Sequence, residues 1–285
     1  MPIQYNEFYN EQTGLTVGIK KQLFHEVTPY QTVEVFETDT WGNLMTIDGM
    51  VMLSEKDEFV YHEMMAHMPL LTHPKPETVL IIGGGDGGTA REVLKHPSVK
   101  HVDMVEIDEA VVRASKLHMP AVGDFDNPKL HVKYENGLTF VDGPREVYDV
   151  IIIDGSDPVG PAVDLFKRDF YEKCHTCLKA DGVLVSQTES PFVEHYHDSI
   201  RSVQRAIDSL FPIAKLFLTW IPLYPTGMWS MSIASKQRDP LSAEVLEIID
   251  TRIATFADTL KYYNKDVHAA AYALPGFVKQ MLESE

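Results

Sequence analysis

The chain has 285 residues, of which 44% are hydrophobic and 24% charged, so it can bury a core in one large domain or two smaller ones. Its formal net charge of −17 argues against binding to nucleic-acid phosphates and is compatible with a cationic substrate. No apolar run reaches the ~20 residues of a membrane span, the N-terminus lacks secretory-signal features, and the two cysteines make no disulfide framework, which together predict a cytoplasmic protein.

Residues 1–70 are predicted to form a small antiparallel β domain that ends in a helix. The segment TVEVFETD (32–39) alternates its side chains as a half-buried strand does, and Gly42-Asn43 and Asp48-Gly49 are hairpin turn signals. The segment 58–71 is a plausible helix, which we expect to end near Pro69 because proline disrupts a helix interior.

Residues 71–285 show strands and helices in alternation, which predicts an α/β domain with right-handed crossovers. A helix fits residues 193–211, and residues 241–285 are expected to be mainly helical and peripheral. The pattern indicates a Rossmann-like, methyltransferase-like, doubly wound and mostly parallel seven-stranded sheet. The candidate strands are Thr78–Ile82, His101–Ile107, Leu130–Glu135, Asp149–Ile153, Gly182–Gln187, Ala214–Ile221 and Trp229–Ala234.

A glycine loop follows the first strand of this domain, in the sequence VLIIGGGDGGTAREVLKH (79–96). Gly83, Gly85 and Gly88 fit the G-x-G-x-x-G pattern between a strand and a helix, where missing side chains let a ligand approach the backbone. Glu106 ends the second strand, twenty residues after Asp86, where an acid accepts hydrogen bonds from ribose hydroxyls. The alternative is a glycine turn that serves packing alone.

Asp86 lies inside this loop, where the pyrophosphate of a dinucleotide would be placed. A carboxylate repels phosphates, so the residue suits a ligand that carries a positive group and no phosphate. Adenosyl sulfonium compounds have this chemistry, because they join an adenine and a ribose to a cationic sulfur with an amine-bearing chain. The loop therefore favours a transferase of this class over a dehydrogenase.

Two aspartates follow the fourth strand, in VYDVIIIDGSDPVGP (147–161). Asp154 closes the strand, and ligands bind at the carboxyl ends of strands in an open α/β sheet, so it should face the glycine loop. Asp157 lies three residues further on, in a loop restricted by prolines. The pair suits a cation better than a metal, because no histidine or further acid lies beside it at ligand spacing. Asp157 could also be only a turn or N-cap residue.

Two motifs resemble metal or redox sites, but their spacing favours structural roles. His62 and His67 in HEMMAH are five residues apart, which places them about 140° apart on a helix instead of on one face. Cys174 and Cys177 in CHTC fall in a predicted helix, where packing is favoured over redox chemistry. We predict no metal site.

The motifs together resemble the polyamine aminopropyltransferases, and among them the bacterial spermidine synthases. The likeness covers nearly the whole chain and rests on five segments. It implies transfer of an aminopropyl group from decarboxylated S-adenosylmethionine to putrescine, which gives spermidine and 5′-methylthioadenosine. Decarboxylated S-adenosylmethionine is then a co-substrate, and no cofactor is implied. The segments are DGMVMLSEKDEFVYHEM (48–64), GGGDGG (83–88), EID (106–108), DGSDPVGPA (154–162) and YPTG (224–227).

The resemblance implies a set of contacts to the nucleoside co-substrate. Asp86 would hold the ammonium of the aminopropyl chain, and Glu106 the ribose hydroxyls. Gln31 would contribute from the N-terminal domain. The remaining members of this set are Gly83, Gly85, Asn136 and Gly137. Asn136 departs from the family, which usually has aspartate there as an adenine contact. The amide carbonyl can still accept from the adenine amine, so we expect weaker adenine binding.

The resemblance also implies roles around the diamine. Asp154 would act as general base on the attacking amine, and Tyr61 would position that amine. Asp157 would bind the distal ammonium of putrescine. The other residues assigned to substrate binding are His62, Gln187 and Tyr224. A dimer or tetramer assembled through the N-terminal sheet is implied as well.

Several alternatives stay open at this stage. A putrescine N-methyltransferase would share the fold and use S-adenosylmethionine, whose carboxylate Asp86 should repel. A relative could act on a longer or different amine, because Leu223 replaces a common threonine. A non-catalytic module that binds a nucleoside or polyamine is a further class, although it would not need both Asp154 and Tyr61.

Overall fold

The computed structural model describes residues 3–156 and 164–284. The N-terminal part of the chain forms a five-stranded antiparallel sheet. Its strands follow chain order: β1 (Ile3–Phe8), β2 (Gly14–Val27), β3 (Thr32–Thr38), β4 (Asn43–Ile47) and β5 (Met50–Ser54). The predicted turn at Asp48-Gly49 is confirmed, with φ values of +49° and +81° between β4 and β5. Both residues adopt the left-handed conformation that a two-residue hairpin loop requires.

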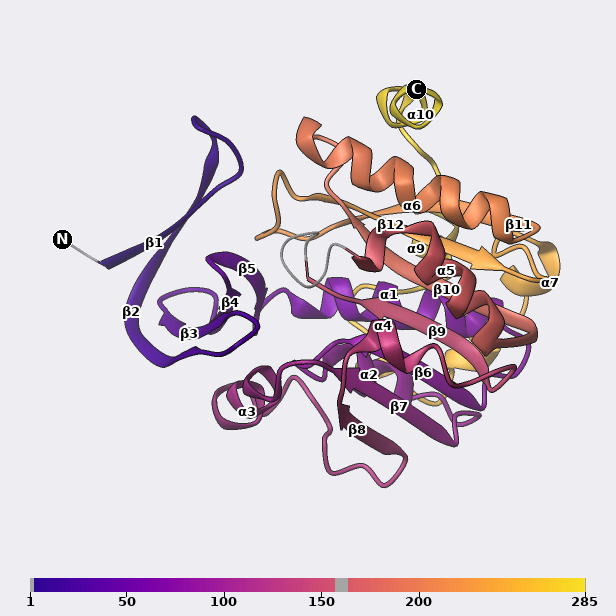
Figure 1. The fold of residues 1–285 in the computed structure, drawn as a ribbon, viewed down its shortest axis with the longest axis horizontal. Helices are drawn as coiled ribbons and strands as arrows, with labels where there is room; N and C mark the ends of the chain where they lie inside the picture. The colour runs from indigo at the N-terminus through magenta and orange to yellow at the C-terminus, as the bar shows by residue number, and fades with distance from the viewer. Residues whose placement is uncertain (1–2, 157–163, 285) are drawn as a thin grey trace.

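A seven-stranded sheet forms the larger part of the molecule, as predicted (Figure 1). Its spatial order is β11-β12-β10-β9-β6-β7-β8, and all strands from β10 to β8 pair in parallel. Only β12 runs against its neighbours among the described strands of this sheet. The strands are β6 (Thr78–Gly83), β7 (His101–Glu106), β8 (Leu130–Tyr134), β9 (Tyr148–Asp154), β10 (Leu178–Glu189), β11 (Ile213–Trp220) and β12 (Met228–Ser235).

Both faces of the seven-stranded sheet are buried, which explains why its central strands are continuously apolar. In β6, Val79 and Ile81 join a core with α1 (Glu58–Thr72) and α2 (Gly88–Leu94). Leu80 and Ile82 point to the opposite face, into a core shared with α5 (Arg168–Cys177) and α6 (His197–Leu210). The turn Glu194–Tyr196 precedes α6, so the helix predicted for 193–211 is confirmed with a later start.

Helix α3 (Glu109–His118) connects the two sheets. Its residues Ala110, Val111 and Ala114 pack against Val33 and Met45 of the N-terminal sheet. The helix follows β7, so the end of that strand is brought next to the N-terminal sheet. This contact gives the cavity described below walls from both parts of the chain.

Helix α1 confirms the helix predicted for 58–71: it includes Pro69 and ends at Thr72. The guanidinium of Arg252 donates hydrogen bonds of 2.7–3.0 Å to the carbonyls of Leu70, Leu71 and His73. Carbonyls at a helix C-terminus have no partner within the helix, so this cation stabilises the last turn.

The C-terminal stretch is helical as predicted, but the expectation that it is peripheral is wrong for residues 249–271. Ile249, Ile253, Phe256 and Tyr263 are buried in the same core as α1 and β6. The apolar residues are spread over short helices, so no single periodic face reveals this burial in the sequence. The helices are α7 (Ala243–Leu246), α8 (Ile249–Ile253), α9 (Lys265–Ala270) and α10 (Gly276–Glu283).

The packing role predicted for the two cysteines is confirmed. Cys174 and Cys177 are buried in α5 and form no disulfide. Burial raises the pKa of the Cys177 thiol to about 11, so it is not a thiolate at neutral pH. Among the helices of the described residues, none is long and apolar enough to span a bilayer.

Glu63 ties α1 to the C-terminal stretch. Its carboxylate is 1% exposed and accepts hydrogen bonds from the backbone N–H groups of Lys261, Tyr262 and Tyr263 at 2.7–2.9 Å. A glutamine has one acceptor oxygen and would point an N–H₂ group at one of these donors.

We therefore expect Glu63→Gln to lower the free energy of unfolding by about 2–4 kcal/mol, because it leaves buried donors unsatisfied. Chemical denaturation checks this value. Exposed Glu11 provides the matched control, and Glu11→Gln should change stability by less than about 0.5 kcal/mol. Equal stabilities of the two variants would contradict the proposed tie.

Candidate active site

A cavity opens between the N-terminal sheet and the carboxyl ends of β6, β7 and β9. Its empty volume is about 1140 Å³, part of it open to solvent, which accommodates a nucleoside with an attached chain. Eleven of the thirteen residues predicted for the site line it: Gln31, Tyr61, His62, Gly83, Gly85, Asp86, Glu106, Asn136, Gly137, Asp154 and Tyr224. Gln187 lines an adjoining pocket that shares Tyr61 and Tyr224, and Asp157 lies outside the described residues.

The glycine loop lets two strand ends approach the cavity. Gly83 has φ +84°, and a Cβ there would lie 2.1 Å from the backbone oxygen of Asp154. A Cβ on Gly85 would lie 2.8 Å from a carboxylate oxygen of Glu106. Packing alone thus requires glycine at both positions, and the same close approach places the two acids in the cavity wall.

Glu106 ends β7 and is 7% exposed. Burial raises the pKa of its carboxyl to about 7, although the backbone N–H of Asp108 donates to it at 2.9 Å. Gln31 reaches the same cavity from the loop after β2. That loop is fixed by Thr28, whose hydroxyl donates to the Asp108 carboxylate at 2.8 Å and to the carbonyl of Gln31 at 3.1 Å.

The Asn136-Gly137 pair lies at the start of the short helix α4 (Gly137–Phe140). The side-chain carbonyl of Asn136 accepts a hydrogen bond from the N–H of Leu138 at 2.9 Å, as an N-cap. This oxygen therefore has one lone pair left for a ligand. A Cβ on Gly137 would lie 2.4 Å from a methyl group of Ile82, so the turn needs glycine.

Asp86, which is partly buried, and buried His62 form an ion pair at the cavity floor. His62 Nε2 lies 3.1 Å from Asp86 Oδ1, which also accepts from the N–H of Gly88 at 2.7 Å. Burial alone would lower the pKa of His62, but Asp86 and Glu58 outweigh it and raise the pKa to about 10. Burial alone would raise the pKa of Asp86, and the His62 imidazolium reverses this to a net lowering. At neutral pH both groups are charged.

Asp154 has neutral hydrogen-bond donors on both oxygens. The Tyr61 hydroxyl donates to Oδ1 and the Thr89 hydroxyl to Oδ2, each at 2.6 Å. Burial raises the pKa of Asp154, and the nearby Asp86 carboxylate raises it further. Burial also raises the pKa of Tyr61 well above its usual value, so its phenol stays protonated. A carboxyl with a raised pKa is suited to accept a proton near neutral pH.

Tyr61 and Tyr224 line both the cavity and the adjoining pocket, which also contains Gln187. The Tyr224 hydroxyl donates to the carbonyl of Met52 at 2.6 Å, which ties the loop after β11 to the N-terminal sheet. The Tyr224 ring lies 5.9 Å from that of Tyr61. Gln187 donates to the carbonyl of Gly155 at 3.1 Å, next to Asp154.

Two contributors to the site were missed from the sequence. Thr89 donates to Asp154 from the first turn of α2, and its place directly after the glycine loop was the signal available. Asp57 accepts from the N–H of Leu223 at 3.1 Å and so holds the loop that carries Tyr224. These two positions are distant in sequence, and nothing local indicates that they meet.

Two family models match the chain. The model described as "Spermine/spermidine synthase domain" matches residues 58–243, which is more than half of the chain. The chain belongs to the spermine/spermidine synthase family. A second model, "Spermidine synthase tetramerisation domain", matches residues 3–55. The predicted domain boundary near residue 70 stays a prediction.

Similar proteins agree with this assignment over the full length. The chain is 46% identical to the polyamine aminopropyltransferase of Bacillus subtilis, covering 98% of both chains. It is 43% identical to that of Moorella thermoacetica, covering 99% of this chain and 97% of the other. The chain belongs to a family of transferases, and these relatives are named as transferases. The protein is therefore a transferase.

Solved structures show the same architecture. A spermidine synthase in complex with the transition-state analogue AdoDATO matches with a TM-score of 0.93 at 39% identity, covering 99% of this chain and 96% of that one. The spermidine synthase of Thermotoga maritima matches with a TM-score of 0.91 at the same identity and coverage. The predicted Rossmann-like fold with an N-terminal antiparallel sheet is therefore confirmed.

The contact between Gly88 and His62 gives a test of the site's packing. A Cβ on Gly88 would lie 2.2 Å from the His62 ring, so Gly88→Ala should displace that ring and lower the free energy of unfolding by about 1–3 kcal/mol. Gly276 is the matched control, because it also begins a helix and no atom lies within 4 Å of the position that a Cβ would take there. Gly276→Ala should be neutral or stabilise by about 0.4–1 kcal/mol. Thermal and chemical denaturation of both variants check the difference, and a neutral Gly88→Ala would contradict the packing.

Proposed function

We propose that this protein is a spermidine synthase. It would transfer the aminopropyl group of decarboxylated S-adenosylmethionine to putrescine and release spermidine and 5′-methylthioadenosine. The observation that carries the proposal is the different surroundings of two acids in one cavity: His62 contacts Asp86, whereas the neutral hydroxyls of Tyr61 and Thr89 donate to Asp154. These contacts accompany a lowered pKa of Asp86 and a raised pKa of Asp154. An ionised acid is suited to bind an ammonium group, whereas an acid with a raised pKa is suited to accept a proton.

The nucleoside would bind between the glycine loop and the N-terminal sheet. Glu106 would accept from the ribose hydroxyls, with Gln31 and Asn136 on the adenosine side. Asp86 would hold the ammonium of the aminopropyl chain. Its Oδ1 is occupied by His62 and Gly88, and no hydrogen bond to Oδ2 is made by the described residues, which leaves that oxygen to the ligand.

The reaction would be a direct displacement. Putrescine arrives as an ammonium, since amines of this kind have pKa values near ~10. Asp154 takes one proton from it, and the freed lone pair attacks the methylene carbon beside the sulfonium. The carbon–sulfur bond breaks with its electron pair on sulfur, which leaves as a neutral thioether. The sulfonium is already a good leaving group, so the chemistry calls for neither a metal nor a cofactor.

Alignment of the reacting atoms would supply much of the rate. Orientation of two bound reactants contributes up to ~7–11 kcal/mol in favourable cases. Tyr61 donates to Asp154, so its oxygen can accept from the attacking amine and place it next to the base. We propose that Tyr224, Gln187 and His62 border the diamine and that Asp157 binds its distal ammonium.

We further propose a homodimer or homotetramer that assembles through the N-terminal sheet, in the cytoplasm. The matched family model for residues 3–55 supports assembly through this sheet. Ile3 and Phe8 of β1 and Val27 at the end of β2 are 64%, 71% and 70% exposed, and a partner would cover them.

Product analysis tests the reaction directly. Purified protein incubated with putrescine and decarboxylated S-adenosylmethionine should form spermidine, whereas S-adenosylmethionine should give no transfer. Mass spectrometry of the amines distinguishes the outcomes. Formation of N-methylputrescine, or binding of both ligands without turnover, would refute the proposal.

Asp154→Asn is the matched variant for this assay. It keeps the size of the side chain and removes the base, so kcat should fall by ~10²–10⁴-fold. Turnover near that of the wild type would remove Asp154 from the role of base.

The pKa of Glu106 predicts a pH dependence of nucleoside binding. Ribose hydroxyls donate to the ionised carboxylate, and the pKa of about 7 in the free protein means that the acceptor is lost as pH falls through 7. Affinity for 5′-methylthioadenosine should therefore be about tenfold weaker at pH 6 than at pH 8, because only the ionised fraction binds.

Calorimetry at the two pH values measures this ratio. Glu106→Gln should bind more weakly and show little pH dependence between them. A wild-type affinity that does not change with pH would show that Glu106 does not bind the ribose in its ionised form.

A further inference from the structure

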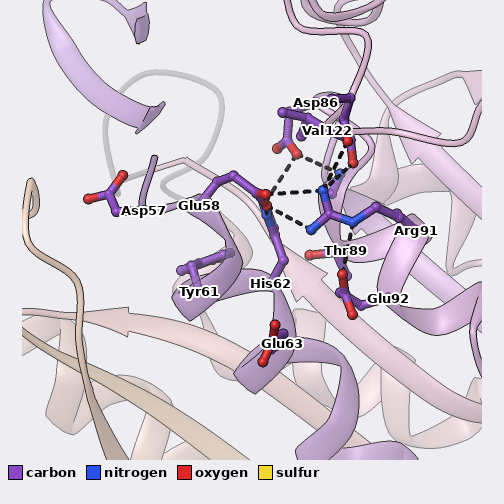
Figure 2. A network of polar contacts seen from close by, with 12 residues as sticks. Asp57, Glu58, Tyr61, His62, Glu63, Asp86, Thr89, Arg91, Glu92 and Val122 are labelled. Carbon is purple, nitrogen blue, oxygen red and sulfur yellow. Dashed lines mark hydrogen bonds and ion pairs between the residues drawn. The ribbon is translucent and has the colours of Figure 1, made fainter. Parts of the chain in front are cut away.

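A chain of charges of alternating sign extends from Asp86 into the protein (Figure 2), with its two central members buried and its two ends partly buried. His62 Nδ1 lies 2.5 Å from Glu58 Oε2, so each ring nitrogen of His62 faces a carboxylate. Arg91 then contacts Glu58 with two nitrogens, at 2.8 and 3.1 Å. The sequence is thus acid, imidazole, acid and guanidinium, with Glu58 7% exposed and His62 2% exposed.

Arg91 is itself held in one position. Its Nε donates to Glu92 at 2.8 Å, and its NH1 nitrogen donates to the carbonyl of Val122 at 2.7 Å. Glu92 is 1% exposed and is also paired with Lys95 at 2.7 Å. A bidentate contact from a fixed guanidinium leaves the Glu58 carboxylate little freedom. The geometry therefore directs Glu58 at His62 even without a ligand.

An imidazole between two carboxylates is most stable in its charged form, the imidazolium. A neutral imidazole has one N–H and one lone pair, and its lone pair would face a carboxylate oxygen on one side. An imidazolium donates on both sides. Both contacts of His62 are within hydrogen-bond distance, which fits the charged form.

The charge of His62 bears on both acids of the cavity. Asp86 faces His62, Arg91, Glu106 and Asp154, and Asp154 faces Asp86, His62, Tyr61 and Thr89. Without a cation next to Asp86, two close carboxylates, one buried and one partly buried, would compete for one proton. His62 relieves this competition on the Asp86 side only, because its Nε2 contacts Asp86.

We propose that Glu58 is a positioning residue of the active site: fixed by Arg91, it holds His62 as an imidazolium against Asp86, so that Asp86 stays ionised and Asp154 alone exchanges the proton of the reaction. Glu58 does not line the cavity and acts through His62. The proton exchange at Asp154 rests on the proposed function, whereas the charge of His62 does not, so the two can fail separately.

Nitrogen NMR of isotope-labelled histidine tests the charge directly, without any substrate. At about pH 8 an ordinary histidine is neutral, and we expect the wild-type His62 signals, assigned with His62→Gln, to be those of an imidazolium. In Glu58→Gln we expect a neutral ring. A neutral His62 in the wild type, or a charged one in the variant, would overturn the proposal whatever reaction the protein catalyses.

The pH profile of turnover tests the consequence for Asp154. In Glu58→Gln the acid limb of kcat/KM should move to higher pH by about one unit or more, since Asp86 and Asp154 then share a proton. Activity should recover at high pH. A uniform loss of activity at all pH values, with an unmoved limb, would show that Glu58 only supports the fold.

Two further variants separate charge from stability. Glu63→Gln changes the next buried acid of α1, which points away from this network in Figure 2, and should lower stability without moving the limb or the His62 signals. If the Glu58→Gln variant fails to fold because Arg91 is left without its charged partner, the double variant Glu58→Gln/Arg91→Met removes both partners. His62 should again be neutral in this double variant. A His62 that stays charged in the double variant would contradict the proposal.

Discussion

Two neighbouring carboxylates in one cavity, Asp86 and Asp154, impose the constraint on which the site depends. Like charges in such surroundings cannot both ionise without help. The two acids have different contacts in the structure. Asp86 contacts the His62 imidazolium, whereas Asp154 accepts hydrogen bonds from the neutral hydroxyls of Tyr61 and Thr89. Identical chemical groups thereby acquire opposite pKa shifts. This difference suits the roles proposed above, in which one acid stays ionised and binds a cation and the other exchanges a proton.

Helix α1 supplies most of this differentiation and is supported on all sides. It carries Tyr61 and His62 towards the cavity, and Glu63 towards the C-terminal stretch. Arg252 from that stretch stabilises its last turn. The helix is buried along nearly its whole length, which explains why its sequence shows no polar face. Residues 249–271 consequently pack against the helix that carries Tyr61 and His62, although none of them lines the cavity.

The strands of the parallel sheet and the turn after its first strand were predicted well from the sequence, because their signals are local. Apolar runs located the strands of the parallel sheet, and the glycine loop located its first turn. Glu106 and Asp154 were placed in the cavity by a rule about strand ends, and both line it. The end of α1 was predicted to within one residue, but the Arg252 that stabilises this end lies far away in the chain and has no local signal. The burial of residues 249–271 was missed because short helices carry little periodicity.

The charge states of the site could not be predicted in this way, because they depend on pairs that are distant in sequence. Tyr61 and Asp154 are 93 positions apart, and Arg91 and Glu58 are 33 apart. A local pattern can show that an acid lies at a strand end, but its pKa follows from the donors and charges that the fold places around it. Asp86, Glu106 and Asp154 illustrate the point: each follows or ends an apolar strand, yet the pKa is lowered in the first and raised in the other two. The difference arises from His62, which only the packing of α1 against α2 and the glycine loop brings to Asp86 and keeps from Glu106.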